Sequence, residues 1–368
     1  MAMLREPGLY DYSPMSERPK ITWPNGARVA FWVAPNIEFY ELDPPLNPGR
    51  RAWPKPHPDV VPHSHRDYGN RAGFWRMMEV MAKYGVRGSV SLNVAMCQHH
   101  PEIIEACSAL DWEFFSHGVY NTRYTYTMTE AQERAMMEDV IKTIKDCTGQ
   151  DTDGWLAPAL SYTTNTFELL TEYGVKYTCD LFHDDQPQPV NTKSGKLISV
   201  PYSLEMNDTV VLSMMGKSSR HYTEILKANF DQLYEEGAEN SQVMCIPLHP
   251  FLIGQPHRIG NFAEVLEYIT GHDKVWVTTG REIAAHYYEH HYDNVVAALT
   301  ANNHRIGGIA TFIGTMRDLS DGKDVAAMTL EHYPGMTEKQ LEAIEREAQA
   351  RWTLEASLII HRYGRFEP

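Results

Sequence analysis

Three polar side chains each follow a run of apolar residues, and their types suit the hydrolysis of a polar bond. Glu38 comes shortly after VAFWVAP, His117 after WEFFS, and His249 after VMCIPL. A carboxylate with apolar neighbours can have a raised pKa and act as a general base, or it can bind a metal. The imidazole of His249 precedes Pro250, which fixes the backbone, and it suits proton delivery to a leaving group near neutral pH. We therefore predict Glu38 and His249 as catalytic residues. The alternatives are a solvated loop acid and a structural histidine.

The residues after the second run are weaker candidates for a metal site. His117 is either a ligand or a histidine of the core, and Asn121, four residues later, is a poor ligand. Two histidines at this spacing would have indicated a metal. Glu38, His117 and Asn121 are thus weak metal candidates. The cofactor stays open between none and a divalent metal such as zinc.

Two further segments contain candidates for substrate contact. In TCDLFHDDQPQPV, Asp184 could orient an imidazole as a catalytic residue and Asp185 could bind a polar substrate, although paired aspartates before a proline also form turns. Trp155 is a candidate substrate-binding residue. Backbone amides in the loop after it, or near His117, would stabilise a tetrahedral oxyanion.

The elements that position these residues alternate along the chain between strand-like and helix-like patterns. Such alternation predicts an α/β fold with a parallel sheet or barrel, in which the residues just after the strands form the site. The expected strands are 29–35, 88–93, 113–116, 243–249 and 275–278, and the expected helices are 74–83, 130–147, 166–173 and 222–236.

Composition excludes several classes of function. The chain has 368 residues, 43% of them hydrophobic and 22% charged, which is typical of a globular protein. Its net charge of −15 makes nucleic acid and membranes unlikely partners. The chain has no apolar stretch of roughly 18 residues and no secretory leader, so we expect it to be cytoplasmic. Its 5 scattered cysteines are best explained as buried free thiols. Without a GxSxG, Walker or dinucleotide motif, serine hydrolase, NTPase and nicotinamide enzymes are disfavoured.

A change of pattern marks a domain junction near Asn294. The alternation runs to the helix 281–291, after which the polar segment NVVAALTANNHR leads into a new pattern. We predict one domain over residues 1–293 and a second over 306–368.

Several segments of the first domain, in order, resemble the polysaccharide deacetylase family over roughly residues 20–291. They are PNIEFYE, YGNRAGFWRMMEVMAKYGVRGSVSLN, FSHGVYN, GWLAPALSYTTNT, CDLFHDDQP, PYSLEMND and LHPFLIGQPHRI. The resemblance implies a distorted (β/α) barrel and hydrolysis of C–N bonds. Metal-dependent members have a D-x-D-like pair and an H-x-x-x-H pair where this chain has Asn36 with Glu38 and His117 with Asn121. This pattern resembles the allantoinase-like branch, which acts on cyclic ureides and is thought to need no metal.

The second domain, from Gly307 onward, is similar to the first part of the catalytic (large) subunit of molybdopterin synthase. GTMR places Arg317 at a position that contacts substrate in that family. The family's catalytic lysines lie further along than this sequence, so we expect no synthase activity. The fold expected here is a small α+β segment.

The sequence as a whole predicts a hydrolase of non-peptide C–N bonds. Its substrate would be a small amide, a ureide or an N-acetyl sugar, and formation of a homo-oligomer stays open. Three alternatives remain, namely an allantoinase-like cyclic ureide hydrolase, an inactive ligand-binding barrel, and a part in molybdenum cofactor biosynthesis through the C-terminal segment.

Overall fold

A computed structural model of the protein describes residues 8–45 and 58–301, and beyond them 319–320, 323–324, 328–330, 336–352 and 364–366. The chain divides into two compact units, Met1–Val296 and Ala297–Pro368.

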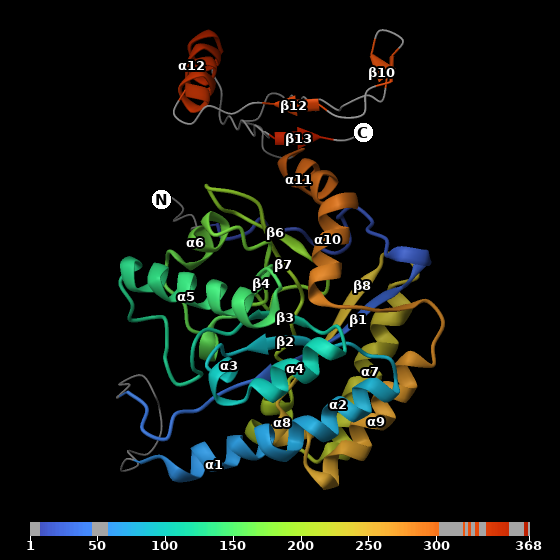
Figure 1. The fold of residues 1–368 in the computed structure, drawn as a ribbon. Helices are drawn as coiled ribbons and strands as arrows, with labels where there is room; N and C mark the ends of the chain where they lie inside the picture. Colours follow the sequence, from blue (N-terminus) through green and yellow to red (C-terminus); the bar gives the residue numbers. More distant parts are fainter. Residues whose placement is uncertain are drawn as a thin grey trace, which may run out of the picture. The chain divides into compact units, whose positions relative to one another are not determined.

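The first unit is built on an open, mostly parallel sheet with helices around its outside (Figure 1), which confirms the α/β prediction. The strand order is β6-β7-β5-β4-β3-β2-β1-β8, β9 also pairs with β1, and only β6 and β7 pair antiparallel. The strands are β1 (Val29–Ile37), β2 (Ser89–Leu92), β3 (Glu113–Ser116), β4 (Gly154–Trp155), β5 (Tyr177–Thr178), β6 (Gln188–Val190), β7 (Leu197–Ser199), β8 (Gln242–Leu248) and β9 (Val275–Val277).

The helices of this unit agree with the sequence pattern where the pattern was strong, and the structure adds several short ones. The longer helices are α1 (Val60–Tyr68), α2 (Phe74–Lys83), α4 (Pro101–Ala109), α5 (Glu130–Thr148), α6 (Thr166–Glu172), α7 (Ser219–Glu236), α9 (Pro256–Thr270) and α10 (Gly280–His290). Helix α11 (Tyr292–Ala301) begins in this unit and continues past its last residue, Val296. The shorter ones are α3 (Met96–His99), α8 (Pro250–Ile253), the 3-10 turns η1 (Pro24–Gly26) and η3 (Pro158–Leu160), and the π-helical segments η2 (Gly69–Gly73) and η4 (Thr209–Met214). Helix α5 begins with a capping box between Thr129 and Gln132 and ends at Gly149, whose φ of +74° is readily adopted by glycine.

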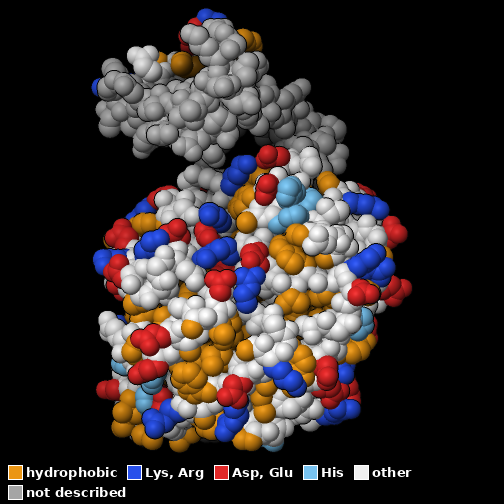
Figure 2. All heavy atoms as spheres, turned by 45° about the vertical axis from the view of Figure 1, so that its right-hand side comes forward, with side chains coloured by type: hydrophobic (Ala, Val, Ile, Leu, Met, Phe, Trp, Pro, Cys, Tyr) orange, Lys and Arg blue, Asp and Glu red, His pale blue; other side chains and the backbone are white. Residues whose placement is uncertain are grey.

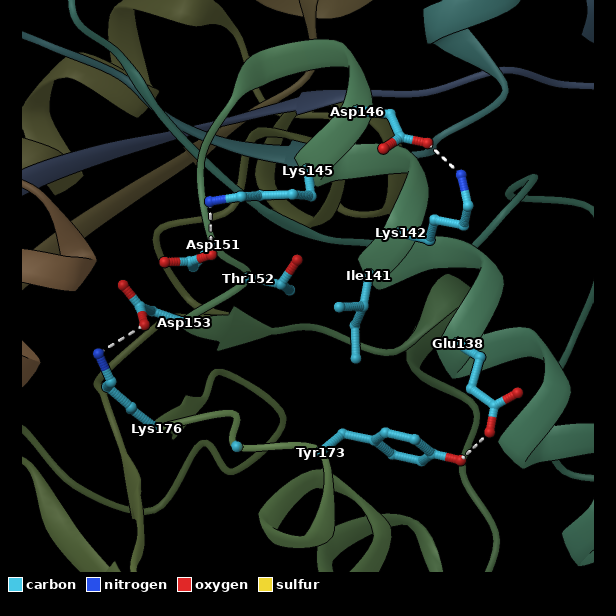
Figure 3. Close-up of a pocket in the computed structure, with 11 residues that line it drawn as sticks. Glu138, Ile141, Lys142, Lys145, Asp146, Asp151, Thr152, Asp153, Tyr173 and Lys176 are labelled. Carbon is cyan, nitrogen blue, oxygen red and sulfur yellow. Dashed lines mark hydrogen bonds and ion pairs between the residues drawn. The ribbon is translucent and has the colours of Figure 1, made fainter. Parts of the chain in front are cut away.

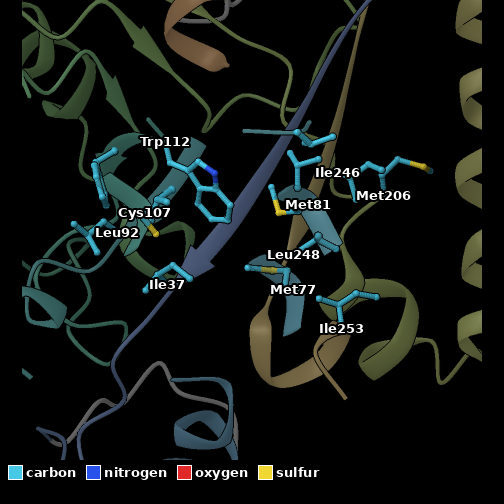
Figure 4. Packing of buried hydrophobic residues seen from close by; sticks show 14 of the residues in the cluster. Ile37, Met77, Met81, Leu92, Cys107, Trp112, Met206, Ile246, Leu248 and Ile253 are labelled. Atoms are coloured by element: carbon cyan, nitrogen blue, oxygen red, sulfur yellow. The ribbon is translucent and has the colours of Figure 1, made fainter. Parts of the chain in front are cut away.

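Strand β1 is next to last in the strand order, and it is buried along its whole length. All nine of its residues are buried, and it pairs with β8 over seven residues on one side and with β2 on the other. A strand covered on both faces must be apolar throughout, as this one is except at Asn36. The apolar side chains around it, among them Ile37, Leu248 and Met77, form the main core (Figure 4).

The carboxyl ends of the parallel strands meet at one edge of the sheet, and the candidate residues follow those ends. Glu38 comes directly after β1, His117 after β3 and His249 after β8. The sheet therefore brings together residues that are 79 to 211 positions apart in the sequence.

The surface of the first unit carries charges of both signs. On the face shown in Figure 2, basic and acidic side chains are interspersed with apolar ones over its described part. None of the helices in the part of the chain that the structure describes combines the length and the apolar character needed to cross a membrane.

The second unit contains two small antiparallel pairs and one long helix among its described residues. Strand β10 (Leu319–Ser320) pairs with β11 (Lys323–Asp324), and β12 (Met328–Leu330) pairs with β13 (Gly364–Phe366). Helix α12 spans Met336–Arg351.

Candidate active site

Glu38 is the centre of a buried polar cluster at the carboxyl edge of the sheet. Its side chain is nearly inaccessible, and its Oε1 accepts a hydrogen bond from Asn121 Nδ2 at 2.9 Å. The same Oε1 lies 3.3 Å from His117 Nε2 and 3.6 Å from His249 Nε2. The other oxygen, Oε2, is buried without a hydrogen-bond partner among the described residues. The structure thus brings together four of the residues singled out in the sequence, with one carboxylate oxygen left to accept a proton.

His249 is held by a residue that sequence reasoning did not select, Asp208. The Nδ1 of His249 lies 2.7 Å from Asp208 Oδ1, and its backbone N–H donates to Oδ2 at 2.8 Å. Thr209 Oγ1 lies 2.9 Å from the same Nδ1. Because the ionised carboxylate can only accept, Nδ1 carries a proton, and Nε2 is turned toward Glu38. A His–Asp pair of this kind fixes the orientation of the ring and stabilises its charged form.

The electrostatics of the cluster favour ionised Glu38 beside charged His249. Burial alone would raise the pKa of Glu38, but the charge of His249 and the hydrogen bonds from both histidines hold that pKa well below its usual value. Burial alone would lower the pKa of His249, but the carboxylates of Asp208 and Glu38 raise it to about 10. Burial raises the pKa of Asp208, and His249 offsets part of that increase. At neutral pH, Glu38 is therefore ionised and His249 is protonated.

His117 and Asn121 orient the carboxylate from the other side. His117 Nδ1 lies 3.2 Å from the carbonyl oxygen of Leu156, which can only accept, so Nδ1 carries a proton and Nε2 faces Glu38. Asn121 accepts from the backbone N–H of Ala159 at 3.0 Å through its Oδ1. It donates through Nδ2 to Glu38 and also to Tyr40 Oη at 2.6 Å. These partners fix the orientation of the amide.

This donor set does not fit a tightly held metal ion. The amide nitrogen of Asn121 faces Glu38, so its oxygen is not available as a ligand at that point, which corrects the weak prediction for Asn121. Asn36 likewise donates through Nδ2 to the carbonyl oxygen of Leu248 at 3.1 Å and to Tyr202 Oη at 2.8 Å. Within the described part of the chain, no three or more His, Cys, Asp or Glu side chains are grouped so that they could hold a metal ion. Glu38 and His117 alone form an incomplete ligand set for zinc.

Asp184 and Asp185 lie at the wrong end of β8 for the roles predicted from sequence. Asp184 pairs with Arg18 at 2.6 Å, and the backbone carbonyl of Asp185 accepts from the N–H of Val243 at 2.9 Å. Val243 is near the start of β8, and His249 follows its end, so about 20 Å of strand separates the two groups. Asp184 and Asp185 are therefore too far from His249 to orient its ring.

The side chain of Trp155 lies in the hydrophobic core of the first unit, not at an accessible site. Trp155 is 1% exposed and belongs to the hydrophobic core, so it packs rather than contacts a substrate. In the loop after it, the N–H of Leu156 donates to Ser116, that of Ala157 to Asp180, and that of Ala159 to Asn121. These amides are thus engaged and are poor candidates for the oxyanion. Arg317 lies outside the described residues.

The segment that contains Asp208 stands out in the sequence, but the distance along the chain between Asp208 and His249 does not indicate that they pair. It lies 41 residues before His249, in the segment PYSLEMND. The only signal was an acidic residue at the end of that segment, just before the hydrophobic run of η4. Nothing local in the sequence shows that this residue meets the end of β8.

A surface pocket lies away from this cluster, beside the start of β4. It has a volume of about 710 Å³ and is lined from α5 and from the segments that precede β4 and β5 (Figure 3). Its lysines pair with neighbouring aspartates: Lys142 with Asp146, Lys145 with Asp151, and Lys176 with Asp153. Paired charges on an open surface do not indicate a ligand, so we assign this pocket no function.

Comparisons with known proteins agree with both resemblances seen in the sequence. The polysaccharide deacetylase family model matches residues 65–178, and the MoaE protein model matches residues 286–368. The structure of a protein described as a polysaccharide deacetylase from Pseudomonas aeruginosa PAO1 is 30% identical, with a TM-score of 0.67 over 74% of this chain and 95% of that one. The structure of Puue Allantoinase is 29% identical, with a TM-score of 0.68 over 75% of this chain and 95% of that one. These similarities confirm the predicted (β/α) barrel type.

The C-terminal segment is similar to molybdopterin synthase catalytic subunits. The subunit from Ralstonia nicotianae is 53% identical over 73 residues, which are 20% of this chain and 42% of that protein. The chain spans less than half the length of the molybdopterin synthase subunits that it matches.

Proposed function

The chain belongs to the polysaccharide deacetylase family, and from this membership we propose that it hydrolyses a non-peptide C–N bond of a small amide or ureide. The observation that carries the proposal is the buried pair of Glu38 and His249, 3.6 Å apart, with Asp208 behind the imidazole. The pair is in the protonation states that a base and an acid require.

The proposed reaction begins with a water that donates a proton to Glu38 Oε2 as its oxygen bonds to the substrate carbonyl carbon. The tetrahedral intermediate then loses its C–N bond, and the departing nitrogen takes the proton from His249 Nε2. The products are a carboxylic acid, or a carbamate from a urea carbonyl, and an amine or amide. Proton transfer from Glu38 to His249 restores the starting state. The low pKa of Glu38 makes it a weak base, so positioning by His117 and Asn121 must supply much of the rate.

Cyclic ureides are the first substrates to test. The similarity to Puue Allantoinase supports this choice, as does the replacement of two metal-ligand positions by Asn36 and Asn121. Linear amides and N-acetyl sugars follow from the family name. The rival within the same family is a barrel that binds such ligands without hydrolysing them.

The test is a hydrolysis screen with the purified full chain over allantoin, formamides and N-acetyl sugars. We expect turnover of at least one ureide or amide, with a loss of roughly 10²–10⁴-fold in kcat for Glu38→Gln, the range typical of a general base. Binding of a substrate without turnover would support the inactive barrel. Turnover that is unaffected by Glu38→Gln would remove the proposed mechanism.

A second candidate function concerns residues 306–368 alone. The 53% identity to a molybdopterin synthase catalytic subunit favours a part in molybdenum cofactor biosynthesis. Molybdopterin formation can be measured in cells that lack their own catalytic subunit and express either the full chain or the chain ending at Val296. Formation that depends on the C-terminal residues would support this function, and equal levels from both forms would exclude it.

A further inference from the structure

Arg66 on α1 lies close to the buried polar cluster and has no carboxylate partner among the residues that the structure describes. Its guanidinium carbon lies 4.5 Å from the ring centre of Tyr40 and 5.2 Å from that of Phe251. No ion pair to Arg66 exists among the described residues, and its Nε is buried without a hydrogen-bond partner there. Arg71, on the next turn, faces Asp67 at 3.9 Å.

Each of the two rings beside Arg66 lies next to one side of the pair formed by Glu38 and His249. Tyr40 Oη is hydrogen-bonded to Asn121, which in turn donates to Glu38. The ring of Phe251 lies 5.6 Å from the ring of His249. One aromatic side chain therefore lies between the guanidinium and each side of the reacting groups, which places Arg66 one side chain away from the pair.

The surroundings of Arg66 add positive charge instead of neutralising it. Arg258 on α9 donates to the carbonyl oxygen of Leu252 at 3.3 Å and has no ion pair among the described residues. Burial and the positive charges of Arg66 and Arg258 together lower the pKa of His65. Both arginines therefore lie close enough to His65 to act on it. In a chain with a net charge of −15, two arginines that have no ion pair within the described part of the chain and lie beside a candidate site favour an anionic ligand.

We infer that the substrate carries a carboxylate or a similar anionic group, and that Arg66 binds this group while the adjacent C–N bond lies at Glu38 and His249. The inference rests on the proposed hydrolase function and narrows its substrate class. A planar guanidinium stacked on aromatic faces is held in place, so it loses little freedom when it binds a carboxylate through two hydrogen bonds. Arg66 is thus a specificity residue that acts at a distance from the bond that breaks.

The test uses two ureides that differ by one charge, hydantoin-5-acetate and hydantoin-5-acetamide. With the full chain, we expect kcat/KM for the acid to exceed that for the amide by at least about tenfold, as one charge-assisted contact would give. Arg66→Gln should lower kcat/KM for the acid by about 10–100-fold, mainly through KM, and leave the amide nearly unchanged. Arg66→Lys should recover part of the loss, and Arg71→Gln is the matched control, which should change neither substrate.

Hydrolysis and binding are measured separately, so that the inference and the proposed function can fail independently. Equal rates for acid and amide, or an equal loss for both in Arg66→Gln, would overturn the inference and leave the hydrolase function standing. If neither ureide is hydrolysed, calorimetric titration with hydantoin-5-acetate decides the inference. Binding that weakens at least tenfold in Arg66→Gln would support it, and binding that is absent or independent of Arg66 would overturn it.

Discussion

The charge of Asp208 determines what His249 can do. Without that carboxylate, Glu38 alone of these two groups would oppose the effect of burial, so the pKa of His249 would be lower. With it, the ring is both charged and oriented, because Asp208 bonds its Nδ1 and the backbone N–H of the same residue.

The first prediction concerns His249→Ala. We expect kcat for the identified substrate to fall by roughly 10²–10⁴-fold, because the departing nitrogen loses its proton donor. The fold should persist, since the side chain lies at the carboxyl edge of the sheet and not in the apolar core, and far-UV circular dichroism checks this. Unchanged turnover would remove His249 from the mechanism.

The second prediction concerns metal dependence. The amide nitrogens of Asn36 and Asn121 each donate a hydrogen bond to a neighbouring oxygen. Of the predicted metal ligands, this leaves Glu38 and His117 as the only strong ones. We expect a divalent ion to bind weakly and activity to survive a chelator at large excess. Metal analysis of the purified chain accompanies the assay, and stoichiometric zinc whose removal abolishes activity would contradict the prediction.

The sequence predicted the residues that follow strands better than those that depend on distant contacts. Glu38, His117 and His249 each come after a strand recognisable by its apolar run, so their meeting followed from the parallel sheet. Asp208 follows no strand, and only the folded chain brings it to His249. Asp184 has the right chemistry for the same task, but its local pattern carried no information on which end of β8 it would reach.

Among the elements, the close packing of η2 on α8 fixes the exit of the chain after His249. A Cβ on Gly73 would lie 2.0 Å from the carbonyl oxygen of Pro250, so only glycine permits this approach. Gly69 meets the backbone of Phe251 in the same way, at 2.7 Å. These contacts explain why the YGNRAGFW run contains two glycines. The sequence alone could not show that these glycines pack against α8.

The third prediction follows from that contact. Gly73→Ala should push α8 away and lower the melting temperature by several degrees, because overpacking of this kind typically costs about 1–3 kcal/mol. It should also reduce kcat, because His249 directly precedes the displaced residues. Gly260→Ala in α9 is the control, because nothing lies within 4 Å of its added methyl group. Equal behaviour of the two variants in thermal unfolding and turnover would show that the contact does not position the loop.

The fourth prediction concerns the carboxyl group that joins the ends of β4 and β5. Asp180 accepts from the N–H of Ala157 and from Thr178 Oγ1, both at 2.9 Å. Burial raises its pKa from 3.8 to about 6, although those hydrogen bonds and His117 oppose the rise. A folded-state pKa above the unfolded value means that this group stabilises the fold most below about pH 4 and that the contribution is lost as the pH rises through about 6.

Asp180→Asn keeps an acceptor for Ala157 and removes the titration. Between about pH 4 and pH 7, the free energy of unfolding of the wild type should therefore fall relative to that of the variant by up to about 3 kcal/mol. Urea unfolding at a series of pH values measures the difference, in which the contributions of other groups cancel. A constant difference across this range would mean that Asp180 titrates normally.

At the scale of the whole molecule, the similarity to polysaccharide deacetylases and the similarity to molybdopterin synthase lie in separate units. Glu38, His117, Asp208 and His249 all belong to the first unit, and so does Arg66. The sequence placed the junction near Asn294, by the loss of α/β alternation, and the first compact unit ends at Val296. Tyr292 and Val295 are buried, so the last residues of this unit contribute to its packing.

The last prediction is that the first unit hydrolyses its substrate alone. A chain ending at Val296 should keep kcat/KM within about twofold of the full chain, since every residue assigned to the reaction remains and the buried side chains of Tyr292 and Val295 are retained. A chain ending at His291 is the matched comparison: it loses those two side chains, and also the ion pair of Asp293 with Lys196. Its melting temperature should fall, because buried apolar area is lost, while the catalytic cluster stays intact. If the chain ending at Val296 folds with an unchanged melting temperature but no longer hydrolyses the substrate, the C-terminal unit contributes to the reaction. The prediction that the first unit acts alone would then be wrong.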